Sequence, residues 1–377
     1  MKFRVERDVL AEAVSWAARG LPTRPPVPVL AGLLVEASTD GTLTLSAFDY
    51  EVSARVSVAA DVAEEGTVLV SGRLLADISR NLPDRPVDVA TDGTKVTLSC
   101  GSSRFTLLTM PADDYPALPQ MPEASGQVPG DVFTLAVSQV TTAAGRDDTL
   151  PILTGVRVEI EGSTIKLLAT DRYRLAERTL SWSPQGTDAS AVALVPARTL
   201  ADTARALGAS ADVELALARS GTGDGLIGFE AGRRRTTSRL LDGEYPKVSA
   251  IFPSSSDTHA VVETAPLVEA VKRVALVAER NAPVRLRFSD GRLSIEAGQT
   301  EDAQASEAIE ASLEGEEIEI AFNPAYLLDG LGALHQPWAR LDFTLPTKPA
   351  LLTGQAEQDG ESDDSFRYVL MPIRLAG

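Results

Sequence analysis

The feature that most constrains this chain is that it repeats itself along its length. Segment 28–32 reads Pro-Val-Leu-Ala-Gly and returns at 151–155 as Pro-Ile-Leu-Thr-Gly. Three further pairs follow in the same order, namely 47–50 with 169–172, 70–77 with 195–202, and 114–116 with 244–246. Two unrelated domains would not share four motifs in one order, so the sequence predicts one domain type that occurs more than once.

A third, fainter copy completes the pattern. An alternating strand pair opens at 282–286 and turns at Asp290-Gly291, and a segment at 322–328 takes the place of the second helix start. The chain then closes on 368–372, Tyr-Val-Leu-Met-Pro. We therefore predict three domains, at 1–125, 126–256 and 257–377.

Each unit combines helices with many short strands. Apolar residues at helical spacing predict six helices, at 7–20, 73–82, 133–146, 198–208, 267–280 and 325–335. The rest alternates between apolar and polar residues and is broken by glycine and proline turns, which predicts about eight strands in each unit. The fold class is α+β, with two helices packed on antiparallel sheets in every unit. Three such units form an arc, and an arc with complementary ends closes by twofold symmetry into a ring.

Composition excludes several classes of protein. The net charge of −18 argues against a protein that grips DNA in a groove, because phosphate contacts need Lys and Arg. Cys100 is the only cysteine, so the chain has no intramolecular disulfide framework and no cysteine-based zinc site. We see no signal peptide, no apolar run of the ~20 residues that a membrane span needs, and no P-loop or Gly-x-Ser-x-Gly motif. The chain is most simply cytoplasmic.

Other motifs receive ordinary structural interpretations. The glycines at 223–228 match a dinucleotide fingerprint in spacing, but a strand pattern follows them, so a hairpin is favoured. Asp49 and Asp171 precede turns at matching positions and are expected to cap the backbone. His259 and His335 have no neighbours at metal-ligand spacing, and we expect no metal.

The arginine run at 233–235 leaves two interpretations open. It is either a nucleic-acid patch or the solvated edge of a strand.

Taken together, the residues resemble a known family. The start at 1–7, the Pro-x-Leu-x-Gly motifs, Ala169-Thr170-Asp171 before Arg174-Leu175, and the ending at 371–375 resemble the bacterial DNA polymerase III beta sliding clamps. The resemblance covers essentially the whole chain. It implies a head-to-tail homodimeric ring of six similar domains that encircles double-stranded DNA without sequence preference, and it implies no catalytic activity and no cofactor.

The resemblance also implies partners. A clamp loader opens and closes the ring with ATP. The DNA polymerase III alpha subunit, other polymerases, ligase and mismatch-repair proteins bind through short clamp-binding peptides, and no membrane is involved. The runner-up function is a diverged clamp paralogue that resists an inhibitor aimed at the peptide groove. Unusual groove positions motivate it, because Arg172, Tyr173 and Ala250 depart from residues found in relatives.

Site residues carry over by position. The peptide groove lies between the second and third units, where apolar side chains would take a peptide's hydrophobic anchors and Arg174 and Arg374 would fix its backbone or an acidic residue. Its positions are Leu153, Thr170, Arg172, Tyr173, Arg174, Leu175, Pro246, Ile251, Pro349, Val369, Met371, Pro372, Ile373 and Arg374. The DNA-facing positions are Arg24, Arg73, Arg146, Asp147, Pro151, Ile152 and Arg198. At the dimer contact, Phe105 and Leu107 of the first unit would meet Ala275 and Leu276 of the third.

The acid surplus fits a ring. The predicted helices hold more bases than acids, while the rest of the chain carries the acidic excess. If the helices line the hole, the surface that faces DNA is mildly positive inside an acidic shell. A ring held by topology needs little phosphate affinity.

Overall fold

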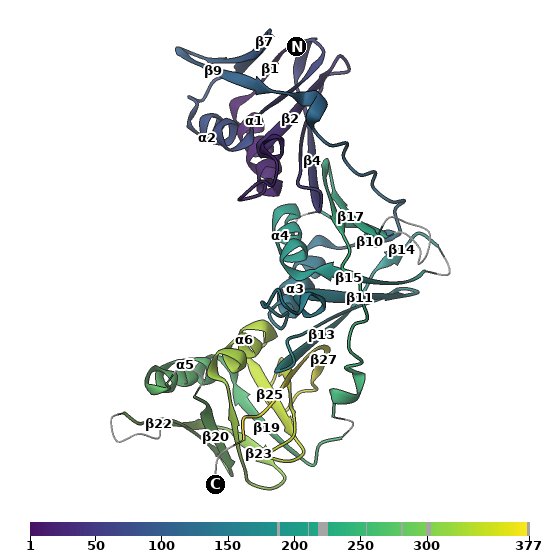
Figure 1. The fold of residues 1–377 in the computed structure, drawn as a ribbon. Helices are drawn as coiled ribbons and strands as arrows, with labels where there is room; N and C mark the ends of the chain where they lie inside the picture. Colours follow the sequence, from purple (N-terminus) through teal and green to yellow (C-terminus); the bar gives the residue numbers. More distant parts are fainter. Residues whose placement is uncertain are drawn as a thin grey trace. The chain divides into compact units, whose positions relative to one another are not determined.

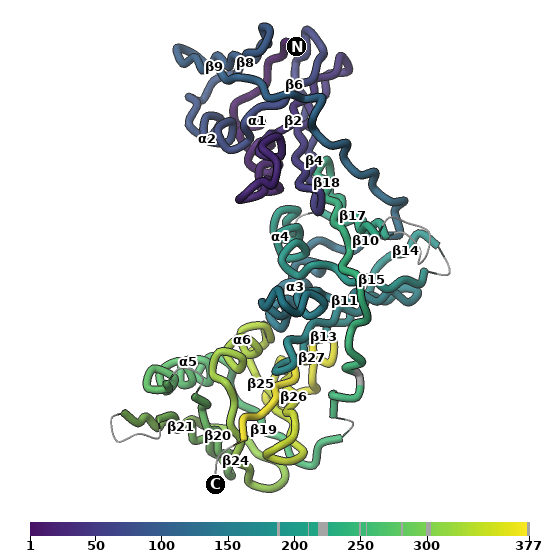
Figure 2. Tube along the Cα trace, in the orientation of Figure 1, coloured from purple at the N-terminus to yellow at the C-terminus, as the bar shows by residue number. Residues whose placement is uncertain are grey.

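The structure is a computed structural model that describes residues 1–186, 189–209, 211–217, 225–253, 255–279, 282–298 and 303–374. The chain forms two compact units (Figures 1 and 2). Unit 1 comprises Met1–Asp131, Ser183–Ala189 and Asp202–Leu240, and unit 2 comprises Val132–Trp182, Ser190–Ala201 and Leu241–Gly377. These units cut across the three predicted repeats, so the boundaries at 125/126 and 256/257 stay predictions.

All six predicted helices are present. They are α1 (Arg7–Ala17), α2 (Gly72–Asn81), α3 (Gly130–Thr141), α4 (Ala197–Leu207), α5 (Thr264–Val274) and α6 (Pro324–Leu334). Short 3-10 turns extend the pattern at Ala18–Gly20, Pro28–Ala31, Ala112–Asp114, Pro151–Thr154, Ser249–Ile251 and Ala275–Val277. The prediction of two helices in each repeat is therefore confirmed.

Unit 1 contains one antiparallel sheet of fourteen strands, in the order β14-β10-β16-β17-β18-β4-β3-β2-β6-β9-β8-β7-β1-β5. In chain order its strands are β1 (Lys2–Val5), β2 (Gly32–Ser38), β3 (Thr42–Phe48), β4 (Val52–Ala59), β5 (Asp61–Glu64), β6 (Gly66–Ser71), β7 (Val87–Asp92), β8 (Lys95–Cys100), β9 (Ser103–Met110), β10 (Gly126–Val128), β14 (Ser183–Pro184), β16 (Val213–Leu217), β17 (Leu226–Ala231) and β18 (Arg234–Arg239).

Unit 2 contains a nine-stranded sheet, β15-β11-β12-β13-β27-β26-β25-β19-β23, and a four-stranded sheet, β22-β21-β20-β24. Its strands are β11 (Gly155–Glu161), β12 (Thr164–Thr170), β13 (Arg174–Ser181), β15 (Ser190–Pro196), β19 (Thr258–Glu263), β20 (Val284–Ser289), β21 (Arg292–Ala297), β22 (Ala305–Glu310), β23 (Ser312–Glu314), β24 (Ile318–Phe322), β25 (Trp338–Phe343), β26 (Ala350–Gln355) and β27 (Asp363–Leu370). Each predicted repeat thus contributes nine strands among the described residues, against about eight expected.

Two strand pairs join successive repeats. β4 of the first repeat pairs with β18 of the second, with Val56 opposite Arg234. β13 of the second pairs with β27 of the third, with Arg178 opposite Phe366. One pairing rule therefore builds both junctions of the chain.

The repeated Pro-x-Leu-x-Gly motif has a packing reason. Its glycine opens β2 at Gly32 and β11 at Gly155. A Cβ added there would lie 2.6 Å from Leu69 Cδ1 in the first case and 2.7 Å from Leu194 Cδ1 in the second. Only glycine lets the strand approach the leucine of the neighbouring strand so closely.

Several expectations about individual motifs can now be assessed. β17 follows Gly225 and contains Gly228, as the strand interpretation predicted, while Gly223 lies outside the described residues. The arginine run at 233–235 does not form a solvated sheet edge, because β18 lies between β17 and β4. Its Arg234 pairs with Glu12, and its Arg235 lies 2.7 Å from Glu230.

Candidate functional site

The β13–β27 pair brings the predicted groove segments together. Leu175 lies opposite Val369, and Arg174 lies opposite Leu370. Beyond the paired residues, Met371 N donates to Tyr173 O at 2.9 Å, and Ile373 N donates to Ala321 O at 2.8 Å. The chain's last described segment is therefore fixed beside the turn at 171–173.

An apolar cluster lies on this strand pair. Its buried members are Leu168, Leu175, Val248 and Val369, and Ile251, Phe252 and Leu351 pack on them while remaining partly exposed. We call these seven residues the apolar cluster. Leu175, Ile251 and Val369 were predicted from the sequence, and the other four were not.

One missed residue has a specific role in the cluster. Phe252 lies under the guanidinium of Arg367, whose Cζ is 4.2 Å from the ring centroid. Arg367 also forms an ion pair with Glu177 of β13. The cation–π contact fixes one side of the cluster. The adjacent Ile251 was the available sequence signal for Phe252.

The remaining predicted groove residues lie around these strands with different exposure. Thr170 is buried and its hydroxyl donates to Arg174 O at 2.6 Å. Leu153 belongs to the loop before β11, where its carbonyl accepts from Gly145 N at 2.7 Å. Half-buried positions are Pro349, Met371, Pro372 and Ile373, and exposed positions are Pro246 and Arg374.

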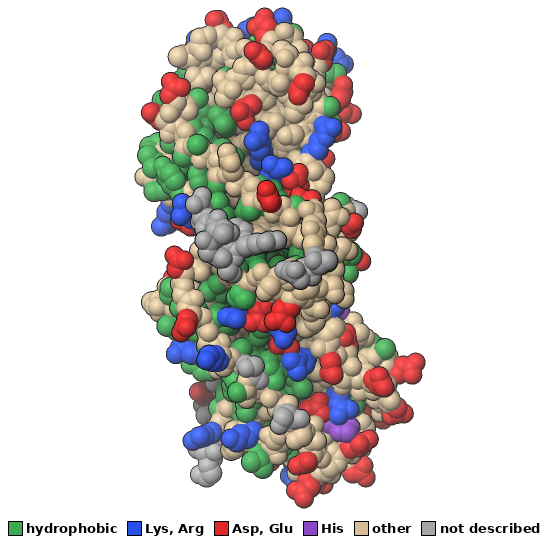
Figure 3. Space-filling model, turned by 90° about the vertical axis from the view of Figure 1, so that its right-hand side faces the viewer, with side chains coloured by type: hydrophobic (Ala, Val, Ile, Leu, Met, Phe, Trp, Pro, Cys, Tyr) green, Lys and Arg blue, Asp and Glu red, His purple; other side chains and the backbone are tan. Residues whose placement is uncertain are grey.

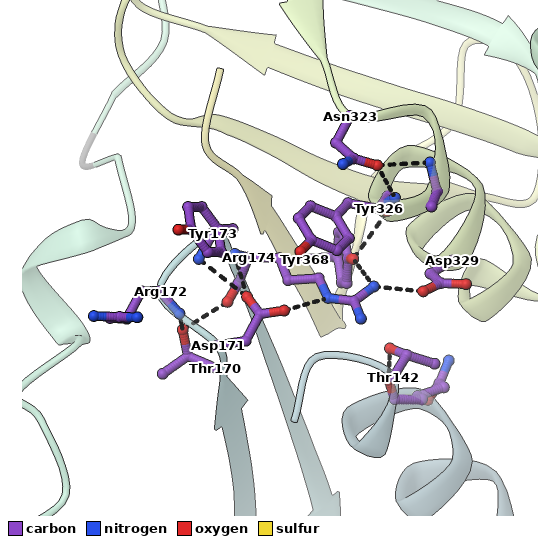
Figure 4. Close-up of polar contacts among 12 residues, drawn as sticks. Thr142, Thr170, Asp171, Arg172, Tyr173, Arg174, Asn323, Tyr326, Asp329 and Tyr368 are labelled. Carbon is purple, nitrogen blue, oxygen red and sulfur yellow. Dashed lines mark hydrogen bonds and ion pairs between the residues drawn. The ribbon is translucent and has the colours of Figure 1, made fainter. Parts of the chain in front are cut away.

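Arg174 does not have the free guanidinium that a peptide contact requires. Its side chain is only 4% exposed. Nε lies 3.1 Å from Asp171 Oδ2, and Nη1 lies 2.5 Å from Asp329 Oδ2 on α6 (Figure 4). The charge of Arg174 is therefore already balanced within the chain, and its role in fixing a peptide stays a prediction.

Two tyrosines complete the surroundings of Arg174. The guanidinium lies over the Tyr326 ring, with Cζ 4.4 Å from the centroid. Nη1 also lies 3.4 Å from Tyr368 Oη, which in turn donates to Tyr326 O at 2.9 Å (Figure 4). Burial raises the pKa of Tyr368, so the phenol stays neutral and remains a donor.

The turn before β13 exposes two side chains. Asp171 Oδ1 accepts from Tyr173 N at 3.0 Å and from Arg174 N at 3.1 Å, which confirms the expected backbone cap. Asp49 makes the same bonds to Glu51 N and Val52 N in the first repeat. The cap holds Arg172 at φ 79°, the left-handed region.

Arg172 and Tyr173 therefore point outward. Figure 4 shows Arg172 directed away from the Arg174 ion pairs, and Tyr173, which is 55% exposed, stacks on Tyr326 with centroids 6.1 Å apart. Arg172 and Tyr173 are two of the three groove positions expected from the sequence to be unusual. They offer a charged and an aromatic contact at the rim of the apolar cluster.

In unit 1 the predicted DNA-facing residues meet at one place. Arg73, at the start of α2, donates from Nη2 to Pro22 O at 3.1 Å. Arg24 lies in the same loop as Pro22, and both arginines are exposed. The hydrogen bond thus fixes the Arg73 side chain against the loop that carries Arg24.

In unit 2 the predicted DNA-facing residues are Arg198, exposed in the first turn of α4, and the loop at 146–152. Within that loop, hydrogen bonds from the Thr149 hydroxyl and amide hold the pKa of Asp147 below its usual value. Residues 146–151 are exposed and Ile152 is half-buried. The loop therefore presents an ionised carboxylate beside Arg146.

The expected excess of bases in the helices is wrong. α3 ends at Thr141, before Arg146, and Arg19 lies in the turn after α1, while Arg280 is outside the described residues. The six α-helices contain equal numbers of basic and acidic residues. Figure 3 shows one face on which basic, acidic and apolar side chains are interspersed.

The predicted dimer residues differ in exposure. Phe105 is exposed, but Leu107 is only 4% exposed and packs in the core of unit 1, whereas its neighbour Leu108 is 69% exposed. Leu276 is 84% exposed, and Ala275 is half-buried beside it. Phe105 and Leu108 are therefore exposed apolar residues of β9, and they lie on opposite faces of the strand.

The described residues offer little for other kinds of site. Across the described ranges, no three His, Cys, Asp or Glu residues are grouped to hold a metal ion. His259 Nε2 lies 3.4 Å from Glu314 Oε2 on the neighbouring strand. None of the helices in the described part of the chain is long and apolar enough to span a membrane.

Comparison with known proteins gives a consistent result. Three family models match, the N-terminal, central and C-terminal domains of the DNA polymerase III beta subunit, at residues 1–119, 127–247 and 249–374. The chain is 64% identical over 377 residues to the beta sliding clamp of Streptomyces coelicolor, covering 100% of both chains. It is 50% identical over 375 residues, again covering 100% of both, to the beta sliding clamp homolog GriR of Streptomyces muensis. Its fold is similar to the Pseudomonas aeruginosa DnaN sliding clamp bound to griselimycin, with a TM-score of 0.92, 29% identity and 100% of both chains covered.

Proposed function

This chain belongs to the DNA polymerase III beta subunit family, the bacterial sliding clamps, and on that premise we propose which of its surfaces do the work of a clamp. The protein is a DNA sliding clamp, a non-catalytic processivity factor of the replicative polymerase. Clamps of this family encircle DNA, form dimers, and bind polymerases and the clamp loader. Because its DNA is the bacterial chromosome, we place the protein in the cytoplasm.

The observation that supports the proposal is that a third junction of the same kind would need strands from two copies of the chain. β4·β18 and β13·β27 join successive repeats within the chain. In both junctions the fourth strand of one repeat pairs with the last strand of the next repeat. By the same rule, β22, the fourth strand of the third repeat, would pair with β9, the last strand of a first repeat. Only a second copy of the chain can supply that β9. β22 is the edge of its sheet, and Ser103–Leu108 of β9 pairs only with β8 among the described residues. Head-to-tail pairing at both ends closes a ring of two chains.

The internal repeats also give the register of this pairing. Arg234 lies opposite Val56, and Phe366 lies opposite Arg178. The hairpin β8–β9 matches β17–β18, and β21–β22 matches β3–β4. Ser103 would therefore lie opposite Glu307 of the second copy, and Phe105 opposite Ala305. Phe105 would then cover Leu276 and Ala275, as expected from the sequence.

For DNA we propose contact by Arg24, Arg73, Arg146 and Arg198. All four are exposed arginines on or beside the repeats' helices and loops. A few such charges give weak, salt-dependent phosphate contacts without stopping the ring from sliding. Asp147 would reduce phosphate attraction at the 146–152 loop, so contact there rests on Arg146 alone.

For partner peptides we propose the apolar cluster, bounded by Tyr173 and Met371. A hydrophobic anchor in a partly exposed apolar pocket with an aromatic and an arginine at its rim is a common mode of peptide recognition. Arg172 and Arg374, which are exposed, replace Arg174 as the basic side chains available to an acidic peptide residue.

The experiment is retention on DNA. After loading, the protein should remain on closed circular DNA and slide off the same DNA once it is cut to a linear form. Equal loss from both would contradict a topological clamp. Mass measurement in solution supplies the second readout, because a monomer cannot close a ring.

A second candidate is a diverged clamp that resists a groove inhibitor. Its support is the 50% identity to GriR and the exposed Arg172–Tyr173 pair. The 64% identity to the Streptomyces coelicolor clamp favours the ordinary clamp. Titration with griselimycin, which is bound to the Pseudomonas aeruginosa clamp, separates the two. Affinity comparable to that of an ordinary clamp would remove the second candidate.

A further inference from the structure

One side-chain hydrogen bond recurs at both junctions of the chain. Trp16 Nε1 on α1 donates to Ala206 O on α4 at 3.3 Å. Gln139 Nε2 on α3 donates to Ala333 O on α6 at 2.8 Å. Each donor is the tenth residue of its repeat's first helix, and each acceptor is the tenth residue of the next repeat's second helix.

This contact has a clear physical purpose. The last carbonyls of an α-helix have no partner within the helix and carry the negative end of its dipole. An N–H donor from a neighbouring helix satisfies one of them and fixes the distance between the two helices. Tryptophan and glutamine share little except that N–H group. The two repeats therefore retain a hydrogen-bond donor at this position, and not a residue type.

The third pair of helices lacks a partner within the chain. The tenth residue of α5 is Arg273, and the tenth residue of α2 is Asn81. α5 and α1 also agree at their ends, because Ala275 and Ala18 make the same pair of capping bonds. The equivalence of Arg273 with Trp16 therefore does not depend on one helix boundary.

Both groups are prepared for a contact. Arg273 uses Nε and Nη2 to bind Glu307 of β22, at 3.0 and 2.5 Å, which leaves the Nη1 hydrogens unused. At the end of α2, Arg7 donates to the carbonyls of Arg80 and Leu82. Among the described residues, the Asn81 carbonyl between these two receives no side-chain donor.

We propose that Arg273 of one protomer donates through Nη1 to the Asn81 carbonyl at the end of α2 in the second copy. The contact completes at the subunit junction the bond that Trp16 and Gln139 make within the chain. It rests on the head-to-tail dimer of the proposed function. In the register given above, Glu307 lies opposite Ser103 of the second copy. β22 therefore places Glu307, which holds the Arg273 guanidinium, at the junction between the two subunits.

The subunit junction differs from the internal ones in charge. Trp16 and Gln139 are neutral, whereas Arg273 places a full positive charge at the negative end of a helix. Glu307 is then a positioning residue, because it holds the guanidinium without using Nη1. The contact therefore adds to dimer affinity and makes it sensitive to salt.

The test is the dimer dissociation constant, measured by sedimentation equilibrium on the full chain. R273A should raise it about tenfold, equivalent to about 1.4 kcal/mol. The matched control is K272A, which removes the same charge from the adjacent residue, where Lys272 pairs with Glu269 on its own helix. K272A should stay within about twofold of the wild type. R273Q should recover part of the loss, since glutamine serves at the second junction.

A double variant tests the role of Glu307. If Glu307 acts through Arg273, then E307A should weaken the dimer less than R273A, and E307A/R273A should equal R273A alone. Thermal melting of each variant shows that it is folded. If the wild type is a dimer and R273A has the same dissociation constant, this inference is wrong and the proposed clamp function stands. A wild-type protein that is monomeric overturns the proposed ring itself.

Discussion

Arg174 on β13 and Asp329 on α6 form a 2.5 Å ion pair that joins the second repeat to the third within unit 2. The guanidinium is buried, and Asp171 and Tyr368 occupy its other sides. The equivalent position in the first repeat is Val52, which lies opposite Ser238 as Arg174 lies opposite Leu370. The two internal junctions therefore share a backbone plan but not their chemistry.

Replacing Arg174 by alanine should destabilise the protein by about 3 kcal/mol, because it leaves the half-buried Asp171 carboxylate and the buried Tyr368 phenol without their partner. Urea unfolding of the two proteins measures the difference. The control is Arg80→Ala, whose exposed pair with Asp77 should contribute less than about 1 kcal/mol. Equal stability of Arg174→Ala and the wild type would show that the network is not structural.

Replacing Met371 by alanine should weaken partner peptides about tenfold, because Met371 is half-buried beside the apolar cluster. Its backbone bond to Tyr173 O would remain. Fluorescence anisotropy with a labelled clamp-binding peptide of the polymerase alpha subunit measures the affinity. Val192→Ala, at an exposed residue of β15, is the control and should bind as the wild type does. If Val192→Ala weakened peptide binding more than Met371→Ala did, the peptide would bind elsewhere.

Removing Arg24 and Arg73 together should weaken DNA contact without opening the ring. The slope of log affinity against log salt should become shallower by about 2, since each lost phosphate contact contributes about 0.9. Anisotropy with duplex DNA over a range of salt gives the slope. Arg4→Ala on β1, whose charge is paired with Asp88, should leave it unchanged. Loss of retention on circular DNA in the double variant would contradict the view that topology holds the ring.

Alkaline pH should destabilise unit 1 through Tyr115. Burial raises the pKa of this phenol from 10.0 to about 12. The unfolded chain therefore loses the proton first, so the stabilisation is complete below pH 10 and is lost as pH rises towards 12. Between pH 8 and pH 11 the loss should be about 1 kcal/mol. Tyr115→Phe should reduce this dependence in urea unfolding, and Tyr50→Phe, at an exposed tyrosine, should not.

The repeats, the helices and the turn caps could be predicted because each depends on short stretches of sequence. Gly32 and Gly155 mark strand starts wherever they occur, and Asp49 and Asp171 cap the turns that follow them directly. The predicted helix ends were less accurate. The apolar pattern continues to Ala144, but α3 ends at Thr141. Beyond it, the amides of Ala143 and Ala144 donate to the carbonyls three residues earlier, those of Val140 and Thr141, instead of continuing the α-helical bonds.

The environment of Arg174 could not be predicted, because Asp329 lies 155 residues away along the chain. Nothing local to either residue indicates the pair. Leu107 is a different case. Neighbouring residues of a strand face opposite sides, so Leu107 packs in the core of unit 1 while Leu108 is exposed, and the role of Leu107 at the dimer contact stays a prediction.

β22 and the Ser103–Leu108 part of β9 each leave one strand edge without a partner among the described residues, which has a consequence for what the protein must avoid. In the proposed head-to-tail pairing these edges complement each other rather than themselves, so every added copy leaves one of each uncovered until the assembly meets its own start. The same contacts that close a two-chain ring would, at a slightly different angle between repeats, propagate into an open filament. In the proposed ring the internal junctions would therefore limit polymerisation, and a variant that loosens them, such as one lacking the Arg174–Asp329 pair, is expected to show long oligomers before it shows unfolded chains.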